Sequence, residues 1–259
     1  MSRAIASANA EYQVLAALRD NRKTRNRENA FIVEGVRNID AAFANGWSVR
    51  AALSPTAAKR SAWATSVIDR VEDHVELAPP LYEALTDRED PPELLLVVEK
   101  QSFMLSQIAI TSELMITVLD RPTSPGNIGT IMRTCDALGS AAVFILGHGA
   151  DPYDPRAVRA STGSFFAVPV IDVEGADELR AWGDQRVALV ATDEHGTHSP
   201  EQLPSGAIAL LFGNESAGLS QNLRDVADRT VAIPMQGTAS SLNVAAAHAI
   251  VLFTASRRG

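Results

Sequence analysis

The sequence predicts a mixed α/β protein, with a parallel sheet in its C-terminal part and a smaller α/β domain in front of it. Three observations support this fold class. The chain has 259 residues, of which 46% are hydrophobic, so it can bury the cores of two domains. From residue 114 onward, short apolar runs alternate with helical patterns. Two glycine-bearing loops follow late apolar runs, and ligands of α/β sheets are held by such loops.

The first hundred residues carry the elements of the smaller domain. Valine and leucine recur at helical spacing over residues 11–20, and the apolar run 31–33 predicts a buried strand. Residues 103–113 show weak periodicity, so we predict an N-terminal domain of residues 1–105 and a C-terminal domain of residues 106–259. The other elements predicted for the smaller domain are helices at about 35–45 and 56–68 and strands at 51–53 and 94–98.

The larger domain begins with a strong apolar strand at residues 114–119. A turn rich in proline and glycine follows, and then a helix at 128–138. Strands separated by helices run parallel, so these elements predict a parallel sheet. The later elements are strands at 142–146, 187–191 and 207–212 and a helix at 242–253.

The charge of the chain argues against a protein that coats nucleic acid nonspecifically. The formal net charge is -8 and the sequence pI is about 5.2, so any RNA recognition must rest on local basic patches. One such patch is formed by four cations within six residues, which could donate to phosphates or simply lie on a solvated loop. The four are Arg22, Lys23, Arg25 and Arg27.

Several features bear on compartment and on metals. The single cysteine, Cys135, excludes an intramolecular disulfide, and the N-terminus lacks the apolar core of a signal peptide. The longest apolar run, 244–253, is about half of the ~20 residues that a membrane span needs. His195 and His198 lack a second ligand group at metal-binding spacing. We therefore expect a cytoplasmic protein with no membrane segment and no metal, and a solvated loop around the two histidines.

Between the strand at 114–119 and the next helix, polar and small residues form a first candidate site. Asn127 is placed to cap the helix. Gly129 and Arg133 are four residues apart on one helical face, so the missing side chain leaves room beside the guanidinium for a phosphate. The alternative is a capped helix with a surface arginine.

A second candidate site follows the strand at 207–212. Gly213 and Gly218 permit positive φ and a close approach of the backbone to a flat ligand such as adenine. Glu215 is either a carboxylate near a helix N-terminus or an acceptor near a cationic ligand.

A third candidate site precedes the last helix. Ile233 and Met235 supply an apolar wall, and Ser240, Ser241 and Asn243 crowd the start of the helix. Simple N-capping explains one of these polar residues but not several beside an apolar wall.

Together the three sites resemble the motifs of the SpoU/TrmH group of SPOUT methyltransferases. These enzymes transfer a methyl group from S-adenosylmethionine to a ribose 2'-hydroxyl in ribosomal or transfer RNA. The match covers about residues 114–255, and residues 151–163 resemble the segment that the family carries between its motifs. Residues 18–25 and 31–35 are similar to the substrate-binding domain, related to the ribosomal-protein L30e fold, that many members carry in front. The motifs are Asn127 and Gly129 with Arg133, residues 212–215 with Gly218 and Leu219, and residues 233–235 through 241–244.

The resemblance implies a deep trefoil knot in the C-terminal domain, a homodimer, and S-adenosylmethionine as the cofactor. The resemblance implies an RNA substrate, and because the chain is acidic we predict that RNA contacts the basic patch at residues 22–27. The catalytic residues carried over from the motifs are Asn127, Arg133, Glu215, Ser241 and Asn243. The cofactor-binding residues are Thr192, Gly213, Gly218, Ile233, Met235 and Leu242.

The substrate implied by the extra N-terminal domain is 23S ribosomal RNA. The alternatives are a transfer RNA 2'-O-methyltransferase and a non-catalytic protein that binds RNA or assists ribosome assembly. Methyl transfer needs alignment and a route for the hydroxyl proton, without a metal or a covalent intermediate. Arg133 could position a phosphate, stabilise the developing alkoxide or assist deprotonation, and its very high intrinsic pKa makes the last role the least favoured.

Overall fold

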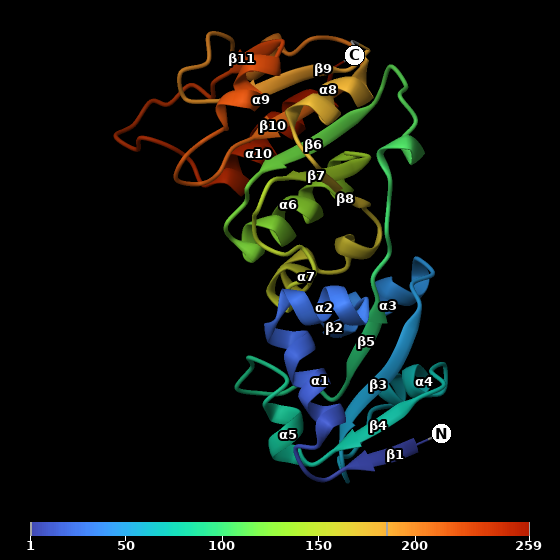
Figure 1. The fold of residues 1–259 in the computed structure, drawn as a ribbon. Coiled ribbons are helices and arrows are strands. Elements are labelled where there is room, and N and C mark those ends of the chain that lie inside the picture. Colours follow the sequence, from blue (N-terminus) through green and yellow to red (C-terminus); the bar gives the residue numbers. More distant parts are fainter. Residues whose placement is uncertain (1, 185, 259) are drawn as a thin grey trace. The chain divides into compact units, whose positions relative to one another are not determined.

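The computed structural model describes residues 2–184 and 186–258, and the chain divides into two compact units (Figure 1). Unit 1 contains the residues up to Gln101 together with Tyr153–Phe166. Unit 2 contains Ser102–Pro152 and the residues from Ala167 onward. A short segment from the middle of the sequence thus belongs to the same unit as the N-terminal residues.

Unit 1 is built on a five-stranded mixed sheet in the order β1, β4, β3, β5, β2. The first three of these strands are parallel, and β5 is antiparallel to β3 and β2. The strands are β1 (Ser2–Ile5), β2 (Ala30–Glu34), β3 (Val49–Pro55), β4 (His74–Leu77) and β5 (Leu95–Glu99). The helices are α1 (Ala10–Asp20), α2 (Arg22–Glu28), α3 (Val36–Ala44), α4 (Ala62–Ile68), α5 (Pro79–Glu83) and α7 (Pro155–Ser161), with the 3-10 turn η2 (Ser164–Phe166).

Two expectations for this unit need correction. The helix expected at 56–68 begins only at Ala62, because Ser61 caps it by accepting a hydrogen bond from the Ala64 N–H, and Ala57 has a φ of 58°. Residues 22–28, for which a solvated loop was one interpretation, form helix α2 with Asn21 as its N-cap.

Unit 1 has an aromatic cluster around Phe31 of β2, apart from the buried hydrophobic cluster that residues 5–97 form. Phe31 is fully buried and packs edge-on against Tyr153 and Phe165, at ring-centroid distances of 5.0 and 5.6 Å. The Trp47 indole N–H donates to the Phe166 carbonyl oxygen at 3.0 Å. Tyr153 donates its hydroxyl hydrogen to the Gln101 carbonyl oxygen at 2.8 Å. The segment 153–166 therefore completes the interior beside β2.

A buried ion pair joins the same segment to the end of β2. Arg159 of α7 donates to the Glu34 carboxylate at 2.6 Å, and the Glu34 side chain is only 5% exposed. Thr86 also donates to Glu34, at 3.0 Å. Both oxygens of this buried carboxylate are thus satisfied, as burial of a charge requires.

Unit 2 contains a six-stranded sheet in the order β11, β9, β10, β6, β7, β8 (Figure 1). Every pairing in it is parallel, so the prediction of a parallel sheet is confirmed. The strands are β6 (Met115–Asp120), β7 (Ala142–Leu146), β8 (Val170–Val173), β9 (Ala188–Thr192), β10 (Ile208–Phe212) and β11 (Arg229–Val231). The helices are α6 (Pro125–Leu138), α8 (Ala176–Gly183), α9 (Gln221–Val226) and α10 (Val244–Ser256), with the 3-10 turns η1 (Leu105–Gln107) and η3 (Pro200–Gln202).

The order of these strands places a switch point beside β6. The chain adds β7 and then β8 on one side of β6, and it later places β10 directly on the other side. In open parallel sheets, ligands bind beyond the carboxyl ends of the strands at such a point. The strands β7 and β10 are buried at every residue, as expected for a sheet covered on both faces.

A buried polar cluster lies between the sheet and the helices α6 and α10, which pack together. The Thr117 hydroxyl contacts the His248 Nε2 at 3.0 Å and the Cys135 Sγ at 3.2 Å. Burial lowers the pKa of His248 to about 3 and raises the pKa of the Cys135 thiol to about 11. Both groups are therefore neutral near pH 7, and Cys135 is packed as a small, unreactive side chain.

The helices do not suggest a membrane span. Across residues 2–184 and 186–258, each helix is too short or too polar to cross a bilayer.

Candidate functional site

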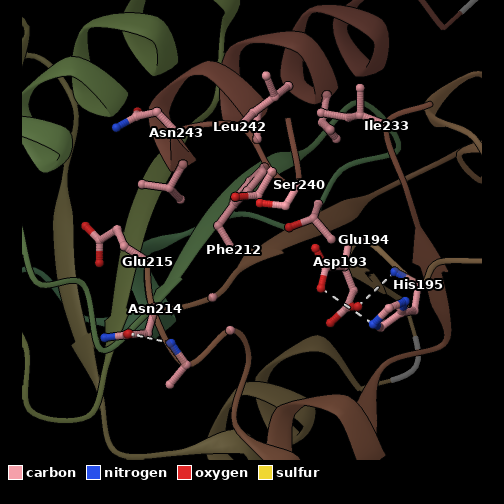
Figure 2. A pocket seen from close by; sticks show the side chains of 18 of the residues that line it. Asp193, Glu194, His195, Phe212, Asn214, Glu215, Ile233, Ser240, Leu242 and Asn243 are labelled. Carbon is pink, nitrogen blue, oxygen red and sulfur yellow. Dashed lines mark hydrogen bonds and ion pairs between the residues drawn. The ribbon is translucent and has the colours of Figure 1, made fainter. Parts of the chain in front are cut away.

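A cavity of about 610 Å³ opens at the carboxyl ends of β9, β10 and β11 (Figure 2). Its walls include Thr192 at the end of β9, Phe212 at the end of β10 and Val231 at the end of β11. The loop 213–218 and the residues 240–244 before and at the start of α10 complete it. The volume is typical of a site for a small molecule or cofactor.

The predicted cofactor-binding residues all line this cavity. The two glycines belong to the loop after β10, while Met235 and Leu242 form a partly exposed apolar rim, at 41% and 37% exposure. Figure 2 shows Ile233 and Leu242 along one side of the cavity, with Asp193 and His195 across from them. The six residues are Thr192, Gly213, Gly218, Ile233, Met235 and Leu242.

The loop after β10 closes on itself. The Asn214 N–H donates to the Gly218 carbonyl oxygen at 3.1 Å, and the Gly218 N–H donates back to the Asn214 carbonyl oxygen at 2.9 Å. Gly218 has a φ of 65°, which favours glycine. A Cβ at Gly213 would lie 2.3 Å from the backbone of Gly218 and Leu219. Gly213 therefore allows a close approach of the protein's own backbone at Gly218 and Leu219, in addition to any approach of a ligand.

Glu215 ties this loop to the start of α6. Its carboxylate accepts hydrogen bonds from the Thr123 N–H at 3.0 Å, the Thr123 hydroxyl at 2.6 Å and the Ser124 N–H at 3.3 Å. Partial burial by itself would raise the pKa of Glu215, but the hydrogen bonds from Thr123 and Asn127 outweigh it and hold the pKa below its ordinary value. The position beside a helix N-terminus also favours the ionised form.

Asn127 does not cap α6, in contrast to the sequence-based expectation. Ser124 is the N-cap, because its hydroxyl accepts from the Asn127 N–H at 3.3 Å and Pro125 occupies the first helical position. The Asn127 side chain instead donates to Glu215 at 3.1 Å and accepts from the Asn243 amide at 3.3 Å. It therefore joins the second and third motifs.

Asn243 has two functions in this geometry. Its side-chain oxygen caps α10 by accepting from the Ala245 N–H at 2.9 Å, and its amide nitrogen reaches Asn127. Helix capping therefore explains the contact of the Asn243 side-chain oxygen but not that of its amide nitrogen. Ser241 is exposed and lines the cavity beside it.

Arg133 lies apart from this network. It is an exposed residue further along α6 and is not among the residues that line the cavity. Within the described part of the chain, Arg133 has no hydrogen-bond or ion-pair partner. Its guanidinium is therefore available to an external ligand, whereas Asn127, Glu215 and Asn243 are hydrogen-bonded in one network.

Comparison with known proteins identifies the family. The model of the SpoU rRNA Methylase family matches residues 114–253, and that of the SpoU L30e-like domain matches residues 9–96. The chain belongs to the SpoU rRNA methylase family. The resemblance seen in the three motifs is thereby confirmed, and so is an L30e-like domain in front of the SpoU methylase domain.

Relatives similar to this SpoU chain over nearly its whole length are known. The 23S rRNA (uridine(2479)-2'-O)-methyltransferase of Streptomyces viridochromogenes is 41% identical over 99% of this chain and 93% of that protein. The 23S rRNA (guanosine(2553)-2'-O)-methyltransferase RlmP of Bacillus subtilis is 30% identical, with 90% of each chain covered. The crystal structure of the SpoU methyltransferase AviRb from S. viridochromogenes in complex with AdoMet has a TM-score of 0.91 and 41% identity, covering 96% of this chain and 97% of that one.

The SpoU cavity also has a polar wall that sequence reasoning missed. Asp193, Glu194 and His195 line it, on a loop that is solvated as expected, with the His195 side chain 85% exposed. Asp193 is only 11% exposed at its side chain because it pairs with Arg224 at 2.7 Å. Its place directly after β9 was the signal that could have identified it. No group of three or more potential metal ligands occurs among the residues that the structure describes.

The four cations predicted to contact RNA do not share one environment. Arg22, Lys23 and Arg27 are exposed on α2. Arg25 is only 2% exposed, and its Nη1 donates to the carbonyl oxygens of Leu18 and Arg19 at 2.9 and 2.7 Å. Arg25 is therefore removed from the predicted RNA-binding residues. Its guanidinium instead binds the last carbonyl oxygens of α1, where a cation is favoured.

The close crossing at Gly213 leads to a first prediction. We expect Gly213→Ala to weaken binding of S-adenosylmethionine by more than about tenfold, because the added Cβ forces the loop 213–219 open. Isothermal titration with the cofactor measures this. Gly237→Ala is the matched control, since a Cβ at 237 meets nothing within 4 Å. Equal affinities of the two variants would show that the loop tolerates the side chain.

Proposed function

We propose that this protein transfers a methyl group from S-adenosylmethionine to a ribose 2'-hydroxyl of 23S ribosomal RNA. The observation that carries the proposal is the cavity at the carboxyl ends of β9, β10 and β11, where residues of the second and third motifs meet and Asn127 of the first is bound to both. The relatives from S. viridochromogenes and B. subtilis carry this activity in their names.

The residues of the cavity fit S-adenosylmethionine. Phe212, Ile233 and Leu242 offer apolar surface to an adenine ring. Glu194 offers negative charge to a ligand that carries a sulfonium and an ammonium group, whereas the charge of Asp193 is compensated by Arg224. When bound, S-adenosylmethionine supplies an electrophilic methyl carbon, so the chain itself needs to supply alignment and a route for a proton.

Different residues of the protein supply the alignment and the charge. Glu215 is held ionised by its donors and ties the cofactor loop to the start of α6. The hydrogen bonds that Asn127 makes with Glu215 and Asn243 hold the third motif against the start of α6. Arg133 presents an exposed guanidinium that can hold the phosphate next to the reacting ribose and stabilise the developing alkoxide. A guanidinium stays protonated, so it acts by charge.

A direct assay tests this function. Purified protein is incubated with S-adenosylmethionine carrying a labelled methyl group and with either ribosomal RNA or total transfer RNA. Label in 23S rRNA, mapped to one 2'-O-methylated nucleotide, is the expected result. Label only in transfer RNA would reassign the substrate. Failure of the protein to bind S-adenosylmethionine by titration would indicate a non-catalytic RNA-binding protein.

The exposed cations of α2 are proposed to bind RNA phosphates. Substituting Arg22, Lys23 and Arg27 together by glutamine should weaken RNA binding and reduce the slope of log affinity against log salt by about 2 to 3, because each phosphate contact contributes about 0.7 to 0.9. Filter binding between low and moderate salt measures the slope.

A matched triple variant controls for lost charge. Arg37, Lys59 and Arg88 are exposed cations of the same unit, and their substitution by glutamine removes the same total charge. An equal loss of binding and of slope in both triple variants would contradict a specific role for α2.

The assembly implied by the family is proposed as well. Ile250 and Phe253 on α10 are 42% and 50% exposed, which supports a homodimer that covers this apolar face. The close passage of Gly196 against the backbone of residues 231 and 232 supports a knotted C-terminal chain. A substrate in the ribosome supports a cytoplasmic location. Sedimentation velocity of the protein tests the homodimer.

A further inference from the structure

The loop after β10 is held from its β6 side by one arginine and one aspartate. Asp120 ends β6 and is 3% exposed, and Arg121 follows it. The Arg121 Nε and Nη2 donate to the two oxygens of Asp120 at 3.0 and 2.9 Å. The same Nη2 donates to the Gly218 carbonyl oxygen at 3.1 Å. Asp120 also accepts from the Ser220 N–H at 2.6 Å, so this pair holds the chain on either side of Leu219.

A second pair holds the same loop from its β9 side. Asp193 directly follows β9, and the Arg224 Nη1 of α9 pairs with it at 2.7 Å. The Arg224 Nε donates to the Leu219 carbonyl oxygen at 3.1 Å. Because β10 lies between β9 and β6, the loop after β10 is tied to the ends of both neighbouring strands.

We propose that Asp120–Arg121 and Asp193–Arg224 form a two-armed clamp that positions the loop 213–219 for cofactor binding and catalysis. Each guanidinium binds one of two consecutive carbonyl groups, those of Gly218 and Leu219, and is itself oriented by a carboxylate. Hydrogen bonds of this charged and oriented kind are stronger than neutral ones. The proposal rests on the proposed function only in naming S-adenosylmethionine as the ligand of the cavity.

The two arms of the clamp, the β6 arm (Asp120–Arg121) and the β9 arm (Asp193–Arg224), act on different parts of the site. Asp193 and Arg224 line the cavity, so the β9 arm shapes the cofactor side of the loop. The Arg121 carbonyl oxygen accepts from the Asn214 side chain at 2.8 Å, and Thr123, two residues later, donates to Glu215. The β6 arm therefore aligns the cofactor loop with the start of α6, which carries Asn127.

Hydrogen exchange of the protein without cofactor gives a test that does not depend on activity. Arg121→Gln and Arg224→Gln should each speed exchange of the loop amides by about tenfold or more, because loss of one charge-assisted bond shifts the opening equilibrium by that order. The informative amides are those of Asn214, Gly218 and Ser220, which are all hydrogen-bonded.

Arg180→Gln is the matched control for both arms. Arg180 also pairs with an aspartate, Asp228, at 2.8 Å and also donates to a carbonyl oxygen, that of Val226. Asp228 accepts from the Leu189 N–H near the amino end of β9, the opposite end of that strand from Asp193. The control should leave exchange of the loop amides unchanged. Unchanged exchange in Arg121→Gln and Arg224→Gln as well would overturn the clamp.

Titration and kinetics distinguish the two arms. Arg224→Gln should raise the Kd and KM for S-adenosylmethionine, by about tenfold, more than it lowers kcat. Arg121→Gln should lower kcat more than it raises KM. Lysine at either position should restore part of the loss, since it keeps the charge but lacks the fork that reaches a carboxylate and a carbonyl together.

The outcomes are separable from those of the proposed function. A wild-type protein that neither binds the cofactor nor methylates RNA would refute the proposed function, while the exchange experiment would still report on the clamp. Equal loss of kcat and affinity in the two variants and in the Arg180 control would mean that the pairs only stabilise the fold, and it would overturn the proposal.

Discussion

Substitution of Arg133 by alanine is expected to reduce methyl transfer by about a hundredfold or more, which is the effect of losing one oriented charge at a reacting oxygen. Binding of S-adenosylmethionine should stay within about twofold of wild type, because Arg133 does not line the cavity. Isothermal titration measures the binding, and single-turnover methylation of RNA measures the transfer. The expected signature is a low kcat with an unchanged Kd for the cofactor.

Two further variants make this result specific. Thr130→Ala changes another exposed residue of α6 and should leave transfer near the wild-type rate. Arg133→Lys should recover part of the activity, because it restores the positive charge without the planar fork. Near-normal transfer by Arg133→Ala would refute the assigned role. Loss of cofactor affinity in the same variant would place Arg133 at the cofactor.

A chain ending at residue 105 is expected not to fold, although it contains every strand of unit 1. It lacks Tyr153, Phe165 and Phe166, which are buried against Phe31. Truncating one such aromatic side chain costs about 3 to 5 kcal/mol, so losing three amounts to roughly the whole stability of a domain. Loss of Arg159 would also leave the buried carboxylate of Glu34 without its cation.

A linked fragment provides the positive control. Tyr153 contacts the Gln101 carbonyl oxygen, so a short glycine and serine linker can join residue 102 to residue 153. The fragment with residues 153–167 restored should unfold cooperatively in urea and give dispersed NMR spectra. Dispersed spectra from residues 1–105 alone would show that the N-terminal residues suffice. The same comparison tests whether a domain boundary near residue 105 defines an independent folding unit.

The parts of the fold that were predictable have strong local patterns. The strands at 142–146 and 207–212 are continuous apolar runs, and the strand at 114–119 is interrupted only by Thr117, since all three lie in a sheet covered on both faces. The strands β8 and β11 were missed because they are short and carry polar residues such as Asp172 and Arg229. The placement of residues 153–166 in unit 1 depends on tertiary packing, which has no periodic signal in the sequence.

The site also contains features that were predictable from the sequence and features that were not. The glycines and the apolar wall of the cavity were predictable from their positions after strands. The roles of individual polar side chains were harder to predict, because several neighbouring donors and acceptors of similar type compete for the same hydrogen-bond partners. Ser124 caps α6 in place of Asn127, since the helix begins at Pro125. Arg25 resembles its neighbours in sequence, and its burial and its bonds to the last carbonyls of α1 depend on tertiary packing.

The placement of residues 153–166 in unit 1 has a consequence for synthesis on the ribosome. A growing chain cannot complete the interior around Phe31 until Phe166 has left the exit tunnel, well after the last strand of unit 1. By then β6 and β7 have also been made. Burial of Phe31 is thus delayed relative to the usual order, in which an N-terminal domain closes first. During that interval, the aromatic surface of β2 is available to chaperones.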